Sequence, residues 1–183
     1  HQADGFTNYT VFSVWDTYRA LHPLFNIINR QVNTDIVQSM LKHYEQSVHH
    51  ILPIWSHMAN ENWCMIGYHS VSVLADAIAK GLPIDKEEVL KAMVSSSTLP
   101  YYDGLKEYMD KGFVSLESNG SAGSLTLEYA YDDWTIYQTA LRAGNSKLAT
   151  AYQKRALNYQ NAFDTSIGYA RPKHKEGNWK ENF

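Results

Sequence analysis

The sequence predicts an all-α fold made of antiparallel helical hairpins. Apolar side chains recur at helical spacing along most of the 183 residues, and no alternating run is long enough to indicate a strand. The connections between the predicted helices are alternately short and long. Predicted helices 85–96 and 147–163 carry several basic residues, whereas 65–80 and 124–143 carry few. This pattern is typical of hairpins in which one helix lies inside and the other faces water.

Two helices are predicted in the first part of the chain. The first spans about residues 13–30, and Pro23 within it predicts a kink or a break, because proline removes a backbone hydrogen bond. Thr34 is predicted to cap the second helix. One face of that helix is apolar and carries Ile36, Val37, Met40, Leu41 and Tyr44. An irregular connection, 49–63, follows.

The third and fourth predicted helices have clearer ends. The third spans about residues 65–80 and stops at Gly81, because glycine readily adopts the left-handed conformation found after helices. The fourth begins at Asp85, which is followed three residues later by Glu88, the spacing of a capping box. This helix is predicted to end near residue 96.

A further helical hairpin is predicted in the second half of the chain. A short helical turn at about 103–109 and a Gly/Ser-rich loop at 112–123 lead to a fifth helix at 124–143. The sixth helix covers about 147–163. Residues 168–183 show no helical pattern and are predicted to be coil.

Composition and charge argue against several functions. The net charge of −3 gives no broad attraction to nucleic acid or anionic lipid. The basic stretch 171–175 is interrupted by Glu176 and is predicted to be a solvated loop, with a polyanion contact as the alternative. The sequence contains no run of about 18 apolar residues, so no membrane span is predicted. Cys64 is the only cysteine, so an internal disulfide within this sequence is excluded.

Three segments bring acidic and aromatic side chains together: 12–24, 60–63 and 127–134. Each lies near the N-terminal end of an odd-numbered predicted helix. Because successive hairpins make these helices parallel, their N-terminal ends are expected at one face of the molecule. Carboxylates there can accept hydrogen bonds from sugar hydroxyls, while Tyr and Trp rings cover C–H surfaces. The 13 Tyr and 5 Trp also fit a large helical core with polar rims.

Simpler structural roles are open for these residues. Asp16 and Glu128 fit helix capping or ion pairing as well as binding. His69 fits a hydrogen-bonded core histidine, and Asp132 with Asp133 fits one buried and one solvated acid. The sequence shows no zinc-ligand spacing among its clustered histidines, no phosphate-binding glycine loop and no serine nucleophile elbow.

Four motifs follow one another along the chain. They are FSVWDTYR at 12–19, NE at 60–61 leading to CMIGYH at 64–69, ADA at 75–77 with KG at 80–81, and TLEYAYDDW at 126–134. Together they resemble the catalytic domain of glycoside hydrolase family 92. The resemblance implies a calcium-dependent, exo-acting α-mannosidase that inverts the anomeric centre, of a kind found mainly in bacteria that degrade glycans. It also implies a β-sandwich followed by an (α/α)6 toroid, of which these helices would form about half.

The resemblance places residues 1–183 in the N-terminal part of the toroid, without the β-sandwich and the remaining helices. It implies that Trp15 and Asp16 contact a terminal mannose. Four further residues are predicted to shape the same pocket: Glu61, His69, Glu128 and Asp132.

The catalytic pair is not assigned to any residue of this sequence. The family's general acid lies in a Glu-Gly-Asn-Ala-Trp-Gln-like motif, and residues 176–179 read Glu-Gly-Asn-Trp, without the Ala and the Gln. We therefore expect the general acid, the base and most calcium ligands beyond Phe183, and no catalysis by residues 1–183 alone.

The resemblance implies a mannose-containing glycan as partner and a periplasmic, cell-surface or secreted location. Half a toroid is also expected to self-associate through exposed apolar surface. Two other functions stay open. One is a different (α/α)6 carbohydrate enzyme, such as a glucosidase or a lyase. The other is a non-enzymatic helical scaffold that binds a peptide or a protein, in which the acidic clusters would point to different faces.

Overall fold

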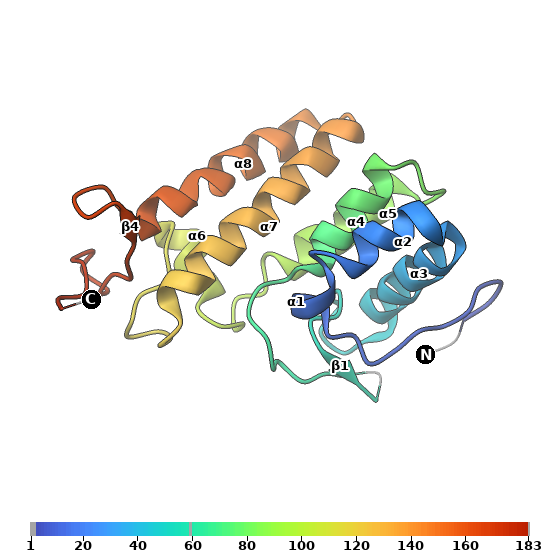
Figure 1. The fold of residues 1–183 in the computed structure, drawn as a ribbon, viewed down its shortest axis with the longest axis horizontal. Coiled ribbons are helices and arrows are strands. Elements are labelled where there is room, and N and C mark those ends of the chain that lie inside the picture. Colours follow the sequence, from blue (N-terminus) through green and yellow to red (C-terminus); the bar gives the residue numbers. More distant parts are fainter. Residues whose placement is uncertain (1–2, 59, 183) are drawn as a thin grey trace.

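The computed structural model describes residues 3–58 and 60–182. Helices dominate the described residues, and the strands among them are only two residues long (Figure 1). The prediction of a helical fold is confirmed. None of the described helices is long and apolar enough to cross a membrane. The elements in chain order are α1 (Val14–Thr17), α2 (Leu21–Ile28), α3 (Arg30–Gln46), β1 (Ser56–His57), β2 (Asn60–Glu61), α4 (Ser70–Ala79), α5 (Lys86–Ser96), α6 (Leu105–Lys111), α7 (Ala122–Arg142), α8 (Ser146–Ala156), the 3-10 helix η1 (Leu157–Ala162), β3 (Phe163–Asp164) and β4 (Tyr169–Ala170).

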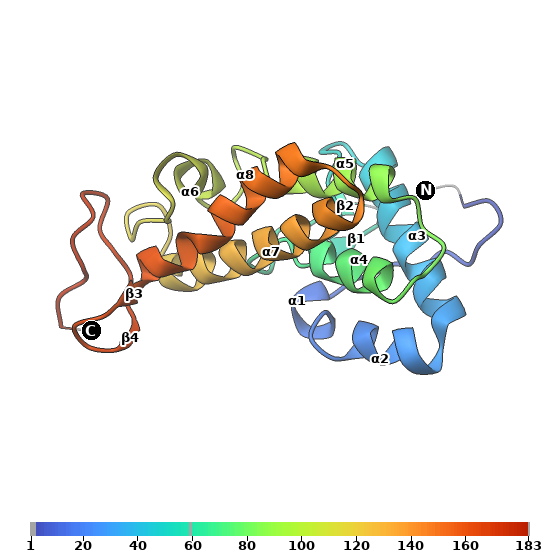
Figure 2. The same cartoon turned by 90° about the horizontal axis from the view of Figure 1, so that it is seen from above.

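The main helices form three antiparallel hairpins, α2–α3, α4–α5 and α7–α8. In Figure 1, α2, α4 and α7 all rise towards the upper right, and their partners return in the opposite direction. Helix α7 packs against α8, α4, α5 and η1. Figure 2 shows α7 and α8 side by side, with α2 and α3 at the other end of the molecule. The common direction of α2, α4 and α7 agrees with the alternation of short and long connections.

Helices α4 and α7 contribute most to the core. Val71 and Leu74 of α4 are fully buried, as are Leu125 and Ile136 of α7. The outer helices α5 and α8 instead expose most of their lysines. The predicted alternation of inner and outer helices is therefore present, since the apolar faces of α4 and α7 pack away from water.

The first predicted helix, 13–30, is broken, but not at Pro23. Helix α1 ends at Thr17, and α2 begins at Leu21. Pro23 lies in the first turn of α2, where a backbone N–H would have no partner within the helix. Proline is therefore tolerated at this position, and the break occurs before it.

The prediction that Thr34 caps the second helix is wrong. Asn29 precedes α3, and its side-chain oxygen accepts a hydrogen bond from the backbone N–H of Val32 at 3.4 Å. Thr34 lies inside the helix, where its hydroxyl donates to the carbonyl oxygen of Arg30 at 2.8 Å. Both residue types serve as caps, so only the backbone conformation distinguishes the two positions.

The next helix boundaries depend on a glycine and a cap. Helix α4 begins at Ser70, five residues later than predicted, because the chain first turns at Gly67 with φ +78°. Asp85 caps α5 as predicted. Its side chain accepts hydrogen bonds from the backbone N–H groups of Glu87 and Glu88 at 2.8 and 2.9 Å.

The C-terminal part of the chain is less regular. The sixth predicted helix, 147–163, changes from α-helix to 3-10 helix at Leu157. The predicted coil, 168–183, contains β4, which pairs with β3 so that Phe163 lies opposite Ala170. Two-residue strands are too short to produce a detectable alternation in the sequence.

Candidate functional site

One buried histidine joins α4 to α7. His69 directly precedes α4 and has only 1% of its surface exposed. Its Nδ1 lies 2.7 Å from Oδ1 of Asp132, and its Nε2 lies 2.9 Å from Oε2 of Glu128. The two acids are four residues apart on α7, so their side chains lie on the same face of that helix. The imidazole ring is thus held between two carboxylates.

The two carboxylates differ in their access to solvent. Asp132 is fully buried, and its second oxygen, Oδ2, accepts a hydrogen bond from the backbone N–H of Tyr68 at 2.8 Å. Glu128 has 22% of its side chain exposed. Of the two acids, only Glu128 therefore has a side chain that is open to solvent.

The acids control the protonation of the histidine. Burial alone would lower the pKa of His69, but the negative charges of Asp132 and Glu128 raise this pKa to about 9. Burial raises the pKa of Asp132 in spite of its contact with His69. Burial acts in the same direction on Glu128, but the interaction with His69 outweighs it and lowers the pKa of Glu128. At neutral pH, the arrangement favours an imidazolium facing an ionised Glu128.

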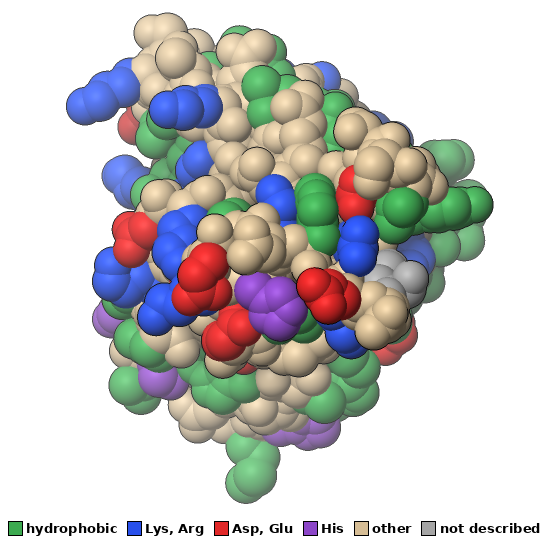
Figure 3. Space-filling view, turned by 90° about the vertical axis from the view of Figure 1, so that its left-hand side faces the viewer, with side chains coloured by type: hydrophobic (Ala, Val, Ile, Leu, Met, Phe, Trp, Pro, Cys, Tyr) green, Lys and Arg blue, Asp and Glu red, His purple; other side chains and the backbone are tan. Residues whose placement is uncertain are grey.

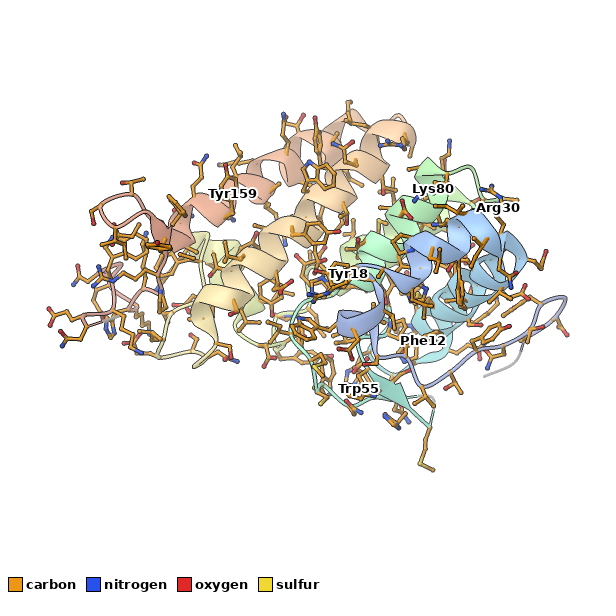
Figure 4. The ribbon with its side chains drawn as sticks, viewed as in Figure 1. Phe12, Tyr18, Arg30, Trp55, Lys80 and Tyr159 are labelled. Atoms are coloured by element: carbon orange, nitrogen blue, oxygen red, sulfur yellow. The ribbon has the colours of Figure 1, made fainter. Side chains whose placement is uncertain are left out.

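Aromatic side chains cover this cluster. The ring of Tyr18 stacks on the ring of His69, with centroids 4.2 Å apart and an interplanar angle of 17°. Arg19 lies over two rings, 4.6 Å from the centroid of Trp15 and 4.9 Å from that of Tyr18. Figure 4 shows Tyr18 in the space between α1 and α7. The segments 12–24 and 127–134 therefore meet in space, as expected.

Trp15 and Asp16 lie at the edge of the cluster. The indole Nε1 of Trp15 is a buried N–H donor. Trp15 also helps to lower the pKa of Glu128, which places its polar edge near that carboxylate. Asp16 is exposed and accepts a hydrogen bond from the hydroxyl of Ser13. The site thus offers two acids, the exposed Asp16 and the partly exposed Glu128.

A groove of about 410 Å³ opens beside Tyr18, between α2, α4 and α7. This volume is in the range of small-molecule sites. The groove has both aromatic and charged walls, with Tyr18, Arg19, Asp76, Tyr131, Trp134 and Arg142 among its lining residues. Aromatic faces next to hydrogen-bonding groups are suited to a sugar. Trp15, Asp16 and Glu128 lie outside the lining of this groove and meet it only through their neighbours Tyr18 and Arg19.

Glu61 does not join the cluster. Its carboxylate accepts hydrogen bonds from the backbone N–H groups of four residues of its own loop: Ile54, Trp55, Asn62 and Trp63. The same loop supports α1, because the carbonyl oxygen of Ile54 accepts a hydrogen bond from the N–H of Val14 at 3.2 Å. These hydrogen bonds give Glu61 a role in folding its loop, and its part in the mannose pocket stays a prediction.

The interpretation of Asp132 and Asp133 as one buried and one solvated acid is wrong, because both are fully buried. Asp133 belongs to a second network, in which it pairs with Nε of Arg155 at 2.9 Å and accepts hydrogen bonds from the hydroxyls of Tyr68 and Tyr108. Burial raises the pKa of Asp133 to about 6, although Arg155 opposes this shift. This pairing could not be predicted from local spacing, because Arg155 is 22 residues away from Asp133.

Comparisons with known proteins identify the family. The sequence profile of the glycosyl hydrolase family 92 catalytic domain matches residues 1–183. The chain belongs to glycosyl hydrolase family 92. A search of curated proteins gives no match.

Two family 92 structures from Bacteroides thetaiotaomicron resemble the chain closely. The α-mannosidase BT3965, solved in complex with mannoimidazole, is 48% identical with a TM-score of 0.95, over 100% of this chain and 24% of that chain. The inverting mannosidase BT2199 is 34% identical with a TM-score of 0.88, over 97% of this chain and 25% of that chain. The family 92 segment described here thus spans about a quarter of the length of these relatives.

The Glu-Gly-Asn-Trp stretch at 176–179 lies away from the cluster in this family 92 chain. The C-terminal coil packs beside the start of α7, where the backbone N–H of Leu116 donates to the carbonyl oxygen of Lys173 at 2.9 Å. Figure 3 views this end of the molecule and shows basic and acidic side chains mixed on its surface. His174 pairs with Glu117 at 2.7 Å. This mixture of charges does not favour the polyanion contact considered for 171–175.

The family resemblance implies calcium, which is bound by carboxylate, carbonyl and water oxygens. No group of three or more His, Cys, Asp or Glu side chains that could hold a metal ion is present in residues 3–58 and 60–182. Within the cluster, both carboxylates face the imidazole of His69, and its positive charge would repel a divalent cation.

Proposed function

We propose that the protein containing this chain removes terminal α-linked mannose from glycans, and that this chain forms part of the wall that binds the mannose. The observation that carries the proposal is the meeting of Trp15 with Glu128 beneath Tyr18, next to the exposed Asp16. The α-mannosidase BT3965 and the mannosidase BT2199, which resemble the chain over nearly its whole length, support the choice of sugar.

The chemistry of these residues suits a pyranose. Each sugar hydroxyl can donate one hydrogen bond and accept others, and the ring has apolar C–H faces. Asp16 and Glu128 supply acceptors. Tyr18 and Trp15 supply aromatic faces. His69 and Asp132 lie behind Glu128 and do not face the ligand.

We infer that the reaction is an inverting displacement. A carboxylic acid protonates the leaving oxygen, and a carboxylate on the opposite face activates a water, with the two groups roughly 6.5–9.5 Å apart. Glu128 and Asp132 are unsuited to these roles because both are tied to the same imidazole. The catalytic pair is therefore expected elsewhere in the protein, as are the ligands of the calcium ion that the family resemblance implies.

Hydrolysis by the full-length protein tests the proposal. We expect it to release 4-nitrophenol from 4-nitrophenyl α-mannoside much faster than from the α-glucoside, and residues 1–183 alone to release none. Activity is also expected to fall on chelation and to return with calcium. Preference for the α-glucoside would support another carbohydrate enzyme instead. Absence of both turnover and mannose binding would support the scaffold.

A further inference from the structure

We propose that His69 and Asp132 are positioning residues that hold Glu128 as a fixed, ionised acceptor for a hydroxyl group of the sugar bound beside Trp15. This inference rests on the proposed function, and it assigns a task to two side chains that cannot themselves touch the sugar. Asp132 is fully buried and His69 is 1% exposed, whereas 22% of the Glu128 side chain is exposed.

The hydrogen bonds and ion pairs of the cluster lead from the buried Asp132 through His69 to the partly exposed Glu128. The backbone N–H of Tyr68 and the Nδ1 of His69 occupy the two oxygens of Asp132, at 2.8 and 2.7 Å. A proton is therefore required on Nδ1 of His69. The other ring nitrogen lies 2.9 Å from Oε2 of Glu128 and needs a second proton for an attractive contact. Asp132 thus fixes the imidazole of His69, and the imidazole in turn fixes the carboxylate of Glu128.

The surroundings prevent the ring from moving. Tyr18 stacks on one side of the imidazole at 4.2 Å. Gly67 approaches so closely that a Cβ atom at this position would lie 2.5 Å from Nε2 of His69. Residues with a fixed orientation lose little further entropy when a ligand binds, so Glu128 is prepared to accept a hydrogen bond.

Glu128, at the solvent-facing end of this series of contacts, is suited to bind a hydroxyl group. The carboxylate of Glu128 accepts hydrogen bonds, and its interaction with Trp15 places it at the polar edge of the indole ring. A sugar hydroxyl can donate a hydrogen bond to this carboxylate. A methyl or hydrogen at that carbon of the ligand would remove this hydrogen bond.

The contact between His69 and Glu128 depends on pH, because it requires the protonated imidazolium form of His69. The groups facing His69 are Glu128, Asp132 and Tyr131 from α7, and Tyr18 from the segment after α1, while Arg19 acts on Glu128. Burial raises the pKa of both tyrosines above 10, so they stay neutral in the relevant range. The pKa of His69 is raised from 6.5 to about 9, so its ionic contact is complete below pH 6.5 and is lost as the pH rises through about 9.

The test compares two neighbouring buried acids in the full-length protein. Asp132→Asn removes the charge behind His69. Asp133→Asn is the matched control, since Asp133 is equally buried on α7 but pairs with Arg155. For 4-nitrophenyl α-mannoside, we expect D132N and His69→Gln to raise KM roughly tenfold, the effect of losing a hydrogen bond to a charged group. The control is expected to retain the wild-type KM.

The pH profile separates positioning from general damage to the fold. In the wild type, KM is expected to rise as the pH passes about 9. In D132N, this rise is expected at a pH lower by roughly one unit or more, because the main charge that raises the pKa of His69 is gone. The D133N profile should follow the wild type. Equal KM values and equal midpoints in D132N and D133N would overturn the proposal.

Crystal structures of both variants give a readout that does not need mannosidase activity. The contact between Glu128 and His69 is expected to be lost in D132N and kept in D133N. If the wild-type protein fails to cleave mannosides, the proposed function fails while this comparison still decides the positioning role. An unchanged Glu128 in D132N would disprove that role.

Discussion

At the scale of single residues, the cluster of His69, Glu128 and Asp132 depends on positions where a side chain of another size would not fit. His69 combines two alternatives that its sequence context left open: it is a buried core histidine, and it also contacts two acids that a binding site would use. Its place depends on Gly67, which has a φ of +78° and leaves room for the imidazole. A glycine is required here both for its backbone conformation and for its lack of a side chain.

Gly67→Ala is therefore expected to destabilise the chain by about 1–3 kcal/mol, because strain at positive φ is combined with a clash against His69. Gly81→Ala is the matched control, since Gly81 has a φ of +73° but no atom within 4 Å of its added Cβ. Urea unfolding measures both. Equal losses would show that the clash contributes nothing.

At the scale of elements, helix starts are where the sequence was least informative. Asn29, Thr34 and Asp85 are all residue types that cap helices. Two of them do so, and the third lies inside α3. The residue type shows that a side chain can cap a helix if the helix begins directly after it. It does not determine where the helix begins, which depends on how α2 packs against α3 and α4.

Asn29→Ala is expected to lower the free energy of unfolding by about 1 kcal/mol, since the N–H of Val32 loses its partner. Thr34→Ala is expected to change this free energy by less than about 0.5 kcal/mol, because alanine favours the helix interior and the lost bond is internal to it. Urea unfolding compares the two variants. A larger loss for T34A would contradict the assignment of Asn29 as the cap.

At the scale of the whole molecule, apolar side chains are left in solvent on two helices. In α2, Ile27 and Ile28 are 71% and 65% exposed, and in α7, Trp134 and Leu141 are each 50% exposed. Large apolar side chains with half or more of their surface exposed are typical of faces that pack against another segment. The family 92 relatives are about four times longer, as expected if further helices pack here.

Residues 1–183 alone are therefore expected to self-associate. Sedimentation velocity should show a mass that increases with protein concentration. The double change Ile27→Lys and Ile28→Lys should weaken this association, because charges oppose burial of the face. Val48→Lys is the control, since Val48 is 80% exposed but lies after α3, away from this face. A strictly monomeric wild-type chain would contradict the expectation.

The sequence by itself determined the helical fold, the direction of its hairpins, the cap at Asp85 and the motifs of family 92, because these depend on local spacing and on residue type. Only the tertiary structure decided which acids meet. Asp132 and Asp133 are neighbours in sequence, but successive helical residues point about 100° apart, so one contacts His69 and the other Arg155. Glu61 instead folds onto its own loop. Pairings such as His69 with Asp132, 63 residues apart, exist only after the packing of α4 on α7 brings them together.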